Sequence, residues 1–182
     1  PYIVRHGLSM MKRKKPFGDR DMQTIMITGC SSGFGLETAR YFLEQGWKVI
    51  ATMRAPQEGV LPASDRLRLV RLDVTSAQSI AEAIAEAGEI DVLVNNAGVG
   101  MLNALEGAPC EAIANLFATN TLGTIAMTQA VIPRFRERRS GTIVNITSAV
   151  TLQPMPLLAV YTASKAAVNA FTESLALELL AF

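Results

Sequence analysis

Histidine is almost absent from this sequence: His6 is the only one in 182 residues. A Ser-His-Asp hydrolase triad requires a histidine beside its nucleophile, and most zinc sites combine histidine with clustered cysteine. Only two cysteines are present, Cys30 and Cys110, and they have neither metal-site nor disulfide-framework spacing. The sequence therefore disfavours triad hydrolases and zinc enzymes. Isolated cysteines fit a reducing compartment, which predicts a cytoplasmic protein.

A long apolar run and a strongly charged body are also missing. No run of about 18 apolar residues lacks a charge or a proline, so we expect no membrane span. The net charge is +1, and residues 1–21 contain six Lys and Arg, so the rest of the chain is mildly acidic. An acidic body argues against nucleic-acid binding. We expect a basic flexible tail over 1–21 and a single domain over 22–182.

The first part of the domain reads as strand, glycine turn and helix. An apolar run over 24–28 predicts a buried strand, and an amphipathic helix is expected over 36–45, closed by Gly46. The turn between them lets the backbone approach a pyrophosphate, whose charge the helix N-terminus favours. A tight turn without a ligand is the alternative. The candidate contacts are Gly29, Ser31, Ser32, Gly33, Phe34 and Gly35.

The second predicted strand, over 48–52, ends close to an arginine. An NAD site places an acidic residue at this strand end, where it bonds the ribose 2′-hydroxyl. The sequence has Arg54 instead, and a guanidinium suits a 2′-phosphate by its charge and its fork of donors. The arginine therefore favours NADP(H) over NAD(H), with Ser31 or Ser32 as candidate helpers. A solvated arginine is the alternative.

Two further strands are predicted, over 67–72 and 91–95. Asp73 follows the first, and it is a candidate either for a hydrogen bond to the adenine amino group or for the cap of the helix expected over 77–87. The second leads into Asn95-Asn-Ala-Gly98. Ligands lie at the carboxyl ends of strands in open α/β sheets, where small residues let a flat ring or ribose approach. A tight strand exit is the alternative.

Helical periodicity extends over 111–139 but is interrupted in the middle. Asn120 and Gly123 are unfavourable inside a helix, so they predict a local distortion or a role for Asn120, such as holding a water. An asparagine that packs between helices explains the sequence equally well. The charged run over 134–139 is expected to be a solvated helix end, where the dipole favours Arg and Lys.

The strongest chemical signal is Tyr161-Thr-Ala-Ser-Lys165, preceded by a predicted strand over 142–147 that ends on Ser148. In a helix over 161–180, Tyr161 and Lys165 leave the same face one turn apart. An ammonium beside a phenol favours the phenolate, which makes the tyrosine a proton donor and acceptor near neutrality. With Ser148 on the same substrate oxygen, this set interconverts an alcohol and a carbonyl if another group carries the hydride. Alone, the pair also fits an ordinary helix surface.

The segment 149–160, between the serine and the tyrosine, is apolar and contains Pro154 and Pro156. One interpretation is that it lies over the mouth of the site, which indicates an apolar substrate. The other is that it belongs to the core.

Six motifs occur in a fixed order along the chain. They are Thr28-Gly-x-x-x-Gly33-x-Gly35, Asp73-Val74, Asn95-Asn-Ala-Gly98, Asn120, Ser148 and Tyr161-x-x-x-Lys165. In this order and spacing they resemble the short-chain dehydrogenase/reductase family, over about residues 25–179. The residues around Gly29, Arg54 and Glu173 are further similar to its hydroxysteroid and retinol dehydrogenase branch.

The resemblance implies an α/β fold, a Rossmann-type doubly wound parallel sheet of strand order 3-2-1-4-5 with helices on both faces. It implies a tetrad in which Ser148 polarises the substrate oxygen and Tyr161 exchanges the proton. Lys165 would assist the tyrosine and bond the nicotinamide ribose, and Asn120 would hold a relay water. The cofactor, NADP(H) rather than NAD(H), would contact Gly29, Ser31, Ser32, Gly33, Phe34, Gly35, Arg54, Asp73, Val74, Asn95, Ala97, Gly98, Tyr161 and Lys165.

Family members also continue for roughly another 70 residues, to a typical domain of about 250 residues. Those residues carry strands 6 and 7, which are missing here, so the chain is expected to be a fragment or a compromised short form. Family members pair through helices that correspond to 111–139 and 161–180, which predicts a homodimer or homotetramer.

These features predict an NADP(H)-dependent oxidoreductase that acts on an apolar small-molecule alcohol or carbonyl. The alternative is an inactive dinucleotide-binding or interaction module. A sugar-nucleotide epimerase or dehydratase shares Tyr-x-x-x-Lys, but the glycine spacing and the Asn-Asn-Ala-Gly stretch disfavour it.

Overall fold

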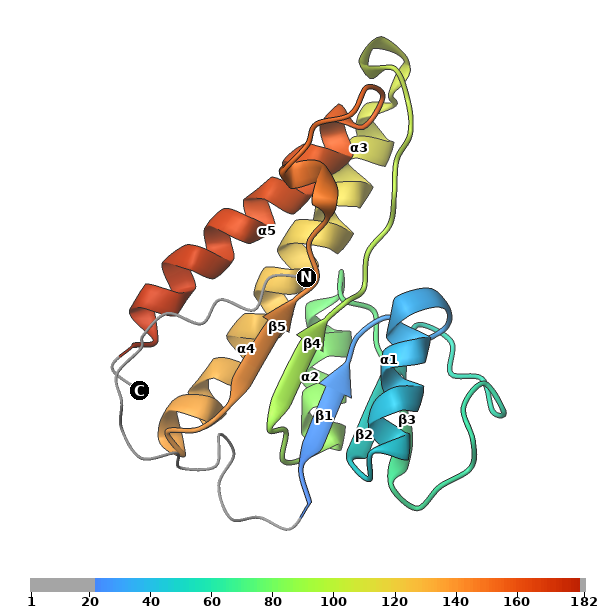
Figure 1. Cartoon of the computed structure of the whole chain (residues 1–182), viewed down its shortest axis with the longest axis vertical. Helices are drawn as coiled ribbons and strands as arrows, with labels where there is room; N and C mark the ends of the chain where they lie inside the picture. Colours follow the sequence, from blue (N-terminus) through green and yellow to red (C-terminus); the bar gives the residue numbers. More distant parts are fainter. Residues whose placement is uncertain (1–21, 181–182) are drawn as a thin grey trace.

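Five short strands form one parallel sheet in the order β3-β2-β1-β4-β5, which confirms the predicted order and fold class (Figure 1). The computed structural model describes residues 22–180, so the predicted tail over 1–21 lies outside the described residues. The strands are β1 (Thr24–Ile27), β2 (Lys48–Met53), β3 (Leu67–Arg71), β4 (Val92–Asn95) and β5 (Thr142–Asn145).

The centre of the sheet is buried on both faces because helices cover each side, as parallel sheets require. Ile25 and Ile27 of β1 point to the face covered by α1 (Gly33–Glu44), whereas Met26 points to the face covered by α2 (Ala77–Ala87) and α4. All three side chains are completely buried. Alternate residues of one apolar strand therefore supply two separate cores.

A long, nearly continuous helix crosses between β4 and β5, as the periodicity predicted. It consists of α3 (Cys110–Phe117), a π-helical turn η2 (Ala118–Leu122) and α4 (Gly123–Glu137). The π-helical turn is the distortion that Asn120 predicted. A side chain at Gly123 would lie 2.8 Å from the Val74 side chain, so this glycine lets the helix pack closely on the strand β3 exit.

The last helix, α5 (Ala159–Glu178), begins two residues earlier than predicted, and it lies along α3 and the π-helical turn. Two short 3-10 turns precede helices in the connections, η1 (Leu105–Gly107) and η3 (Ala149–Thr151). Within residues 22–180, none of the helices has both the length and the apolar character needed to cross a bilayer. The same range contains no cluster of His, Cys, Asp and Glu side chains able to hold a metal ion.

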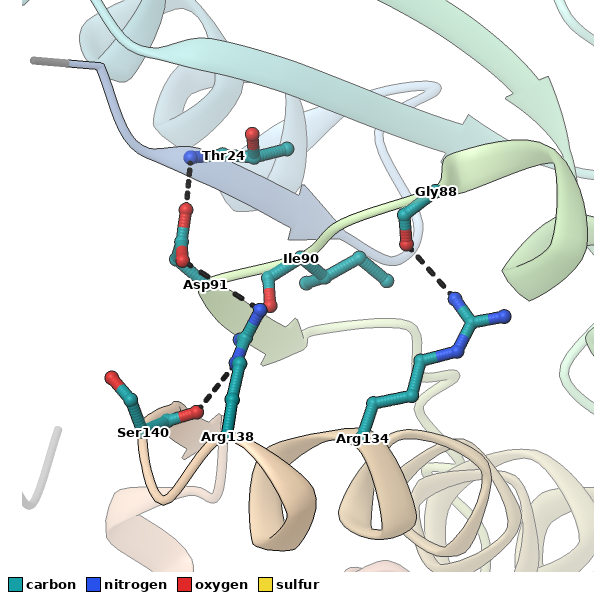
Figure 2. Close-up of polar contacts among 7 residues, drawn as sticks. All are labelled: Thr24, Gly88, Ile90, Asp91, Arg134, Arg138 and Ser140. Carbon is teal, nitrogen blue, oxygen red and sulfur yellow. Dashed lines mark hydrogen bonds and ion pairs between the residues drawn. The ribbon is translucent and has the colours of Figure 1, made fainter. Parts of the chain in front are cut away.

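The charged run at the end of α4 is largely exposed, as predicted for a solvated helix end, with Arg138 half-buried. Two of its arginines also bind neighbouring elements. Figure 2 shows Arg134 reaching across to the end of α2. Its guanidinium donates to the carbonyl oxygens of Gly88, at 2.9 Å, and Ile84, at 3.2 Å. The side chain thus satisfies carbonyl groups that the end of a helix leaves without partners.

Arg138 fixes the same helix end to the first residues of the sheet (Figure 2). It donates to the carbonyl oxygens of Ser140 and Ile90, and it pairs with the Asp91 carboxylate at 3.8 Å. Asp91 in turn accepts a hydrogen bond from the Thr24 N–H at 2.9 Å. These bonds stabilise the end of the sheet where the strands begin. The predicted site lies at the opposite end, where the strands finish.

Candidate functional site

The glycine turn after β1 packs directly against the chain leaving β4. Gly29 has a φ of +74°, and a side chain there would lie 2.8 Å from the Cα of Ala97. A side chain at Gly35 would overlap the Gly29 carbonyl and the Asn96 amide. Two of the predicted glycines are therefore required by this close approach. Gly33 has open space around it, so a side chain would fit there. Its φ of +59° is in the left-handed region, which glycine adopts more readily than other residues.

Helix α1 begins inside the glycine turn, at Gly33 rather than at Leu36 as predicted. Its N-cap residue, Ser32, makes no side-chain hydrogen bond to the first turn, which also carries no acidic residue. Ser31, Ser32 and Phe34 are exposed around this helix end. Uncapped N–H groups at an exposed helix N-terminus are suited to bind a phosphate group.

A reciprocal clamp that the sequence prediction did not assign joins this turn to β4. The hydroxyl oxygen of Thr28 accepts from the N–H groups of Asn96, at 3.0 Å, and Ala97, at 2.9 Å. The Asn96 side chain donates back to the carbonyl oxygens of Thr28 and Gly29. Both residues end an apolar strand with a polar side chain, which is the only sequence signal for the clamp.

Arg54 lies at the end of β2, beside the glycine turn. The N–H of Cys30 donates to the Thr52 carbonyl at 2.8 Å, so the turn runs next to the strand end that leads to Arg54. The Arg54 side chain is exposed. The joint action of Arg54, Ser31 and Ser32 on a 2′-phosphate stays a prediction.

Asp73 follows β3 and serves a local turn. Its carboxylate accepts from the N–H of Thr75 at 2.9 Å and from its hydroxyl at 2.7 Å. These hydrogen bonds hold the pKa of Asp73 below its ordinary value, and the positive charges of Arg54 and Arg71 contribute further. The cap of α2 itself is Ser76, whose hydroxyl oxygen accepts from the Ser79 N–H.

The exit of β4 divides into a buried and an exposed part. Asn95 is buried, and its amide donates to Thr128, at 3.0 Å, and Asn145, at 2.8 Å. Its side chain is therefore committed to the interior of the sheet. Gly98 is exposed, and a side chain there would lie 3.3 Å from both Asn120 Oδ1 and Lys165 Nζ. A side chain at Gly98 would therefore fit tightly against these two groups.

Asn120 sits in the π-helical turn, completely buried. Its Oδ1 accepts from the Val99 N–H at 2.8 Å, and its Nδ2 donates to the Val99 carbonyl at 2.9 Å. Such π-turns are frequent at functional sites. The side-chain amide braces the loop after β4, so both of its polar ends are already engaged.

Lys165 reaches the same place from α5. Its side chain is buried, and Nζ donates to the Ile146 carbonyl at 2.9 Å. Burial lowers the pKa of this ammonium group, because the charged form loses hydration. Tyr161 lies one turn earlier on the same helix and is half-buried, so the structure brings Asn120 and Lys165 together at Gly98 with Tyr161 one helical turn away.

Ser148 begins the 3-10 turn that follows β5, where its hydroxyl oxygen accepts from the Val150 N–H. The Thr151 hydroxyl donates to the Ser148 carbonyl at 2.8 Å and accepts from Asn169 of α5 at 3.0 Å. The bond between Thr151 and Asn169 thus joins the segment of Ser148 to the helix of Tyr161. Within the described residues, the side chains of Ser148 and Tyr161 make no direct hydrogen bond to each other.

The apolar segment after Ser148 is exposed, so the alternative that it belongs to the core is wrong except at Val150. Leu152, Met155 and Leu157 are each more than half exposed. The Leu157 carbonyl accepts from the Asn103 N–H at 2.9 Å, which joins this segment to the loop after β4. That loop exposes two further apolar side chains, Leu102 and Leu105.

Comparison with known proteins identifies relatives over the whole described part. The family model described as short chain dehydrogenase matches residues 23–181. Retinol dehydrogenase 8 of Bos taurus is 42% identical over 172 residues, which are 88% of this chain and 55% of that protein. 17-beta-hydroxysteroid dehydrogenase type 1 of Homo sapiens is 39% identical over 173 residues, 87% of this chain and 52% of that protein.

A solved structure, the closed form of serine dehydrogenase complexed with NADP+, superimposes with a TM-score of 0.81. It is 36% identical, and the match covers 87% of this chain and 67% of that one. The chain spans about half the length of the curated relatives it matches. The fold, the order of the site residues and the match of residues 23–181 show that this chain belongs to the short-chain dehydrogenase family.

Proposed function

We propose that the protein is an NADP(H)-dependent oxidoreductase that interconverts an apolar secondary alcohol and its ketone, or an apolar alcohol and its aldehyde. The observation that carries this proposal is the position of Lys165. Its buried ammonium lies beside the exposed Gly98, one helical turn from Tyr161. Family membership supports the same reaction class, since the relatives named above are dehydrogenases.

The residues present fit a dinucleotide. A bound nicotinamide dinucleotide supplies or accepts the hydride. The uncapped N-terminus of α1, with Gly29, Gly33, Phe34 and Gly35, would bind the pyrophosphate. Arg54 with Ser31 and Ser32 would bind a 2′-phosphate, and a neighbour solved with NADP+ supports this choice over NAD. The adenine would contact Asp73 and Val74; the ribose and ring beyond the pyrophosphate would contact the Asn95 backbone, Ala97, Gly98, Tyr161 and Lys165.

The proton chemistry is assigned to the tetrad. Ser148 donates a hydrogen bond to the substrate oxygen, and Tyr161 delivers or removes the proton. The Lys165 ammonium favours the phenolate form of that tyrosine. Because the Asn120 side chain is engaged with Val99, a relay water would bind its main-chain carbonyl oxygen. That oxygen accepts from Thr124 at 2.9 Å and has a second lone pair.

The substrate is assigned as apolar from the surface around Tyr161. Leu152, Met155 and Leu157 of the segment before α5, and Leu102 and Leu105 of the adjoining loop after β4, expose apolar area. An apolar ligand gains free energy by covering such area. The names of the relatives, a retinol dehydrogenase and a hydroxysteroid dehydrogenase, agree with this class.

Two further assignments remain proposals. We place the protein in the cytoplasm, and we propose that it forms a homodimer or homotetramer through the long helix of α3, η2 and α4 and through α5. Leu122 of η2 and Leu177 of α5 are strongly exposed. Burial of these side chains against a second copy would remove apolar area from water. Light scattering that finds a stable monomer contradicts the assembly.

A dinucleotide-binding module without turnover is the second candidate. The observation that favours it is that the chain spans only about half the length of these relatives. A single experiment separates the two. NADPH fluorescence is titrated with protein, and NADPH oxidation is then followed with a panel of apolar ketones and aldehydes. Binding with turnover supports the oxidoreductase, binding without any turnover supports the module, and absence of binding contradicts both.

A further inference from the structure

Ser164 lies inside the Tyr161-Thr-Ala-Ser-Lys165 stretch and yet cannot touch a substrate, because it is completely buried. It is three residues after Tyr161 and directly precedes Lys165. Its hydroxyl donates to the Tyr161 carbonyl at 2.8 Å and accepts from Asn120 Nδ2 at 3.2 Å. One side chain thereby connects two members of the proposed tetrad, Tyr161 and Asn120, and it belongs to the residue directly before a third, Lys165.

A second hydrogen bond holds the same residue from its backbone. The hydroxyl of Thr121, the residue after Asn120 in the π-helical turn, donates to the Ser164 carbonyl at 3.0 Å. Asn120 and Thr121, consecutive residues of the π-helical turn, thus bind the side chain and the main chain of Ser164 respectively. Two bonds to one residue fix both the depth and the rotation of α5 at this point.

The rotation of α5 decides where its reactive side chains lie. Adjacent residues of a helix differ by about 100° around its axis, so fixing Ser164 fixes the directions of Tyr161 and Lys165. Reacting groups must be held in a near-attack geometry, and a misplacement of about 1 Å can cost about a hundredfold in rate. A buried serine that is merely satisfied would affect stability without affecting this geometry.

We propose that Ser164 is a positioning residue for proton transfer, which holds α5 on the π-helical turn so that Tyr161 and Lys165 face the reacting groups. This inference rests on the proposed function. Ser164 acts through Tyr161 and Lys165 and contributes no proton of its own. It also gives the π-helical turn a purpose, since that turn places Asn120 and Thr121 against one residue of α5.

The test compares Ser164→Ala and Thr121→Val with Ser174→Ala, an exposed serine of the same helix. Thr121→Val keeps the shape of the side chain and removes only the hydroxyl, and Thr121→Ser restores it. We expect Ser164→Ala and Thr121→Val to lower kcat by about tenfold to a hundredfold, with a shifted pH profile and a nearly unchanged KM. Thr121→Ser should recover most of the rate, and Ser174→Ala should match the wild type.

Activity is counted per folded molecule, from the stoichiometry of NADPH binding, so that partial unfolding does not imitate the effect. The emission of bound NADPH is a readout that needs no turnover: it should move towards that of free NADPH in Ser164→Ala and Thr121→Val. If the wild type binds NADPH but reduces no carbonyl, the proposed function fails. The emission of bound NADPH still shows whether Ser164 positions α5. Unchanged emission, kcat and pH profile in both variants would overturn the inference and leave Ser164 a structural serine.

Discussion

The side-chain amide of Asn120 brackets the backbone of Val99, accepting from its N–H at 2.8 Å and donating to its carbonyl at 2.9 Å. The two residues are 21 positions apart, and the pairing imitates one rung of a β-ladder. It holds the loop after β4 against the π-helical turn. The pairing fixes the position of Val99, the residue directly after Gly98.

Replacing Asn120 by leucine should destabilise the protein by about 1–3 kcal/mol, since it removes the partners of both Val99 backbone groups. Urea unfolding followed by circular dichroism measures this change. Asn115→Leu, at an exposed position of α3, is the matched control and should stay close to the wild type. Equal stability of the two variants would mean that the hydrogen bonds between Asn120 and Val99 contribute nothing to the stability of the fold.

Arg54→Ala should raise the Kd for NADPH by about tenfold or more, the effect of losing a hydrogen bond to a charged group. The Kd for NADH should hardly change, because NADH has no 2′-phosphate. Fluorescence titrations with both cofactors provide the measurement. Lys48→Ala removes an exposed positive charge at the opposite end of the same strand and serves as the control. An equal loss of affinity for both cofactors would contradict the assignment of Arg54.

Leu157→Gly should raise KM for an apolar substrate by about tenfold, because it deletes an exposed apolar side chain beside the site. The fold should tolerate the change, since Leu157 has a φ of +64°, a left-handed backbone that favours glycine. Arg139 has a φ of +50° at the far end of α4, so Arg139→Gly tests the backbone effect alone. If both variants change KM equally, the apolar side chain of Leu157 has no part in substrate binding.

The buried Lys165 predicts a pH dependence of stability. Below both pKa values the ammonium is charged in the folded and the unfolded chain, and the full cost of burying it is present. Burial lowers the pKa of Lys165 in the folded protein. As the pH rises past that lowered value towards the ordinary lysine pKa of about 10.4, the unfolded chain binds more protons, and stability rises.

The stability of the wild type relative to Lys165→Met should therefore increase with pH in the window just below the ordinary lysine pKa. Urea unfolding of both proteins at a series of pH values gives this difference, in which other titrating groups cancel. Lys48→Met, which replaces an exposed lysine in the same way, controls for the change of residue type. A flat difference for Lys165→Met would show that its charge is not buried in solution.

The positions of the strands could be predicted because each is a short apolar run between turn residues, whereas their order in the sheet came from the family resemblance. Such runs at 24–28, 48–52 and 91–95 correspond closely to β1, β2 and β4. The distortion at Asn120 was predictable from helix propensity, but its form as a π-helical turn was not. Helix ends shifted by a few residues, as at Gly33, where the glycine turn itself forms the first helical turn.

What sequence reasoning missed are contacts between residues far apart in the chain. The clamp between Thr28 and Asn96 joins positions 68 apart, and the bond between Asn120 and Ser164 joins positions 44 apart. Local patterns contain no information on such pairs, which depend on how helices and strands pack. The hydrogen bonds of Arg134 were missed for the same reason, because the carbonyl oxygens that it binds belong to the end of α2.

The central claim is that Tyr161 transfers the proton, and the turnover of Tyr161→Phe tests it most directly. The variant is measured with NADPH and the best ketone or aldehyde of the panel, beside Tyr41→Phe, which alters an exposed tyrosine of α1. We predict that Tyr161→Phe loses about 10²–10⁴-fold in kcat, while it still binds NADPH and Tyr41→Phe keeps the wild-type rate. Wild-type turnover in Tyr161→Phe would contradict the account.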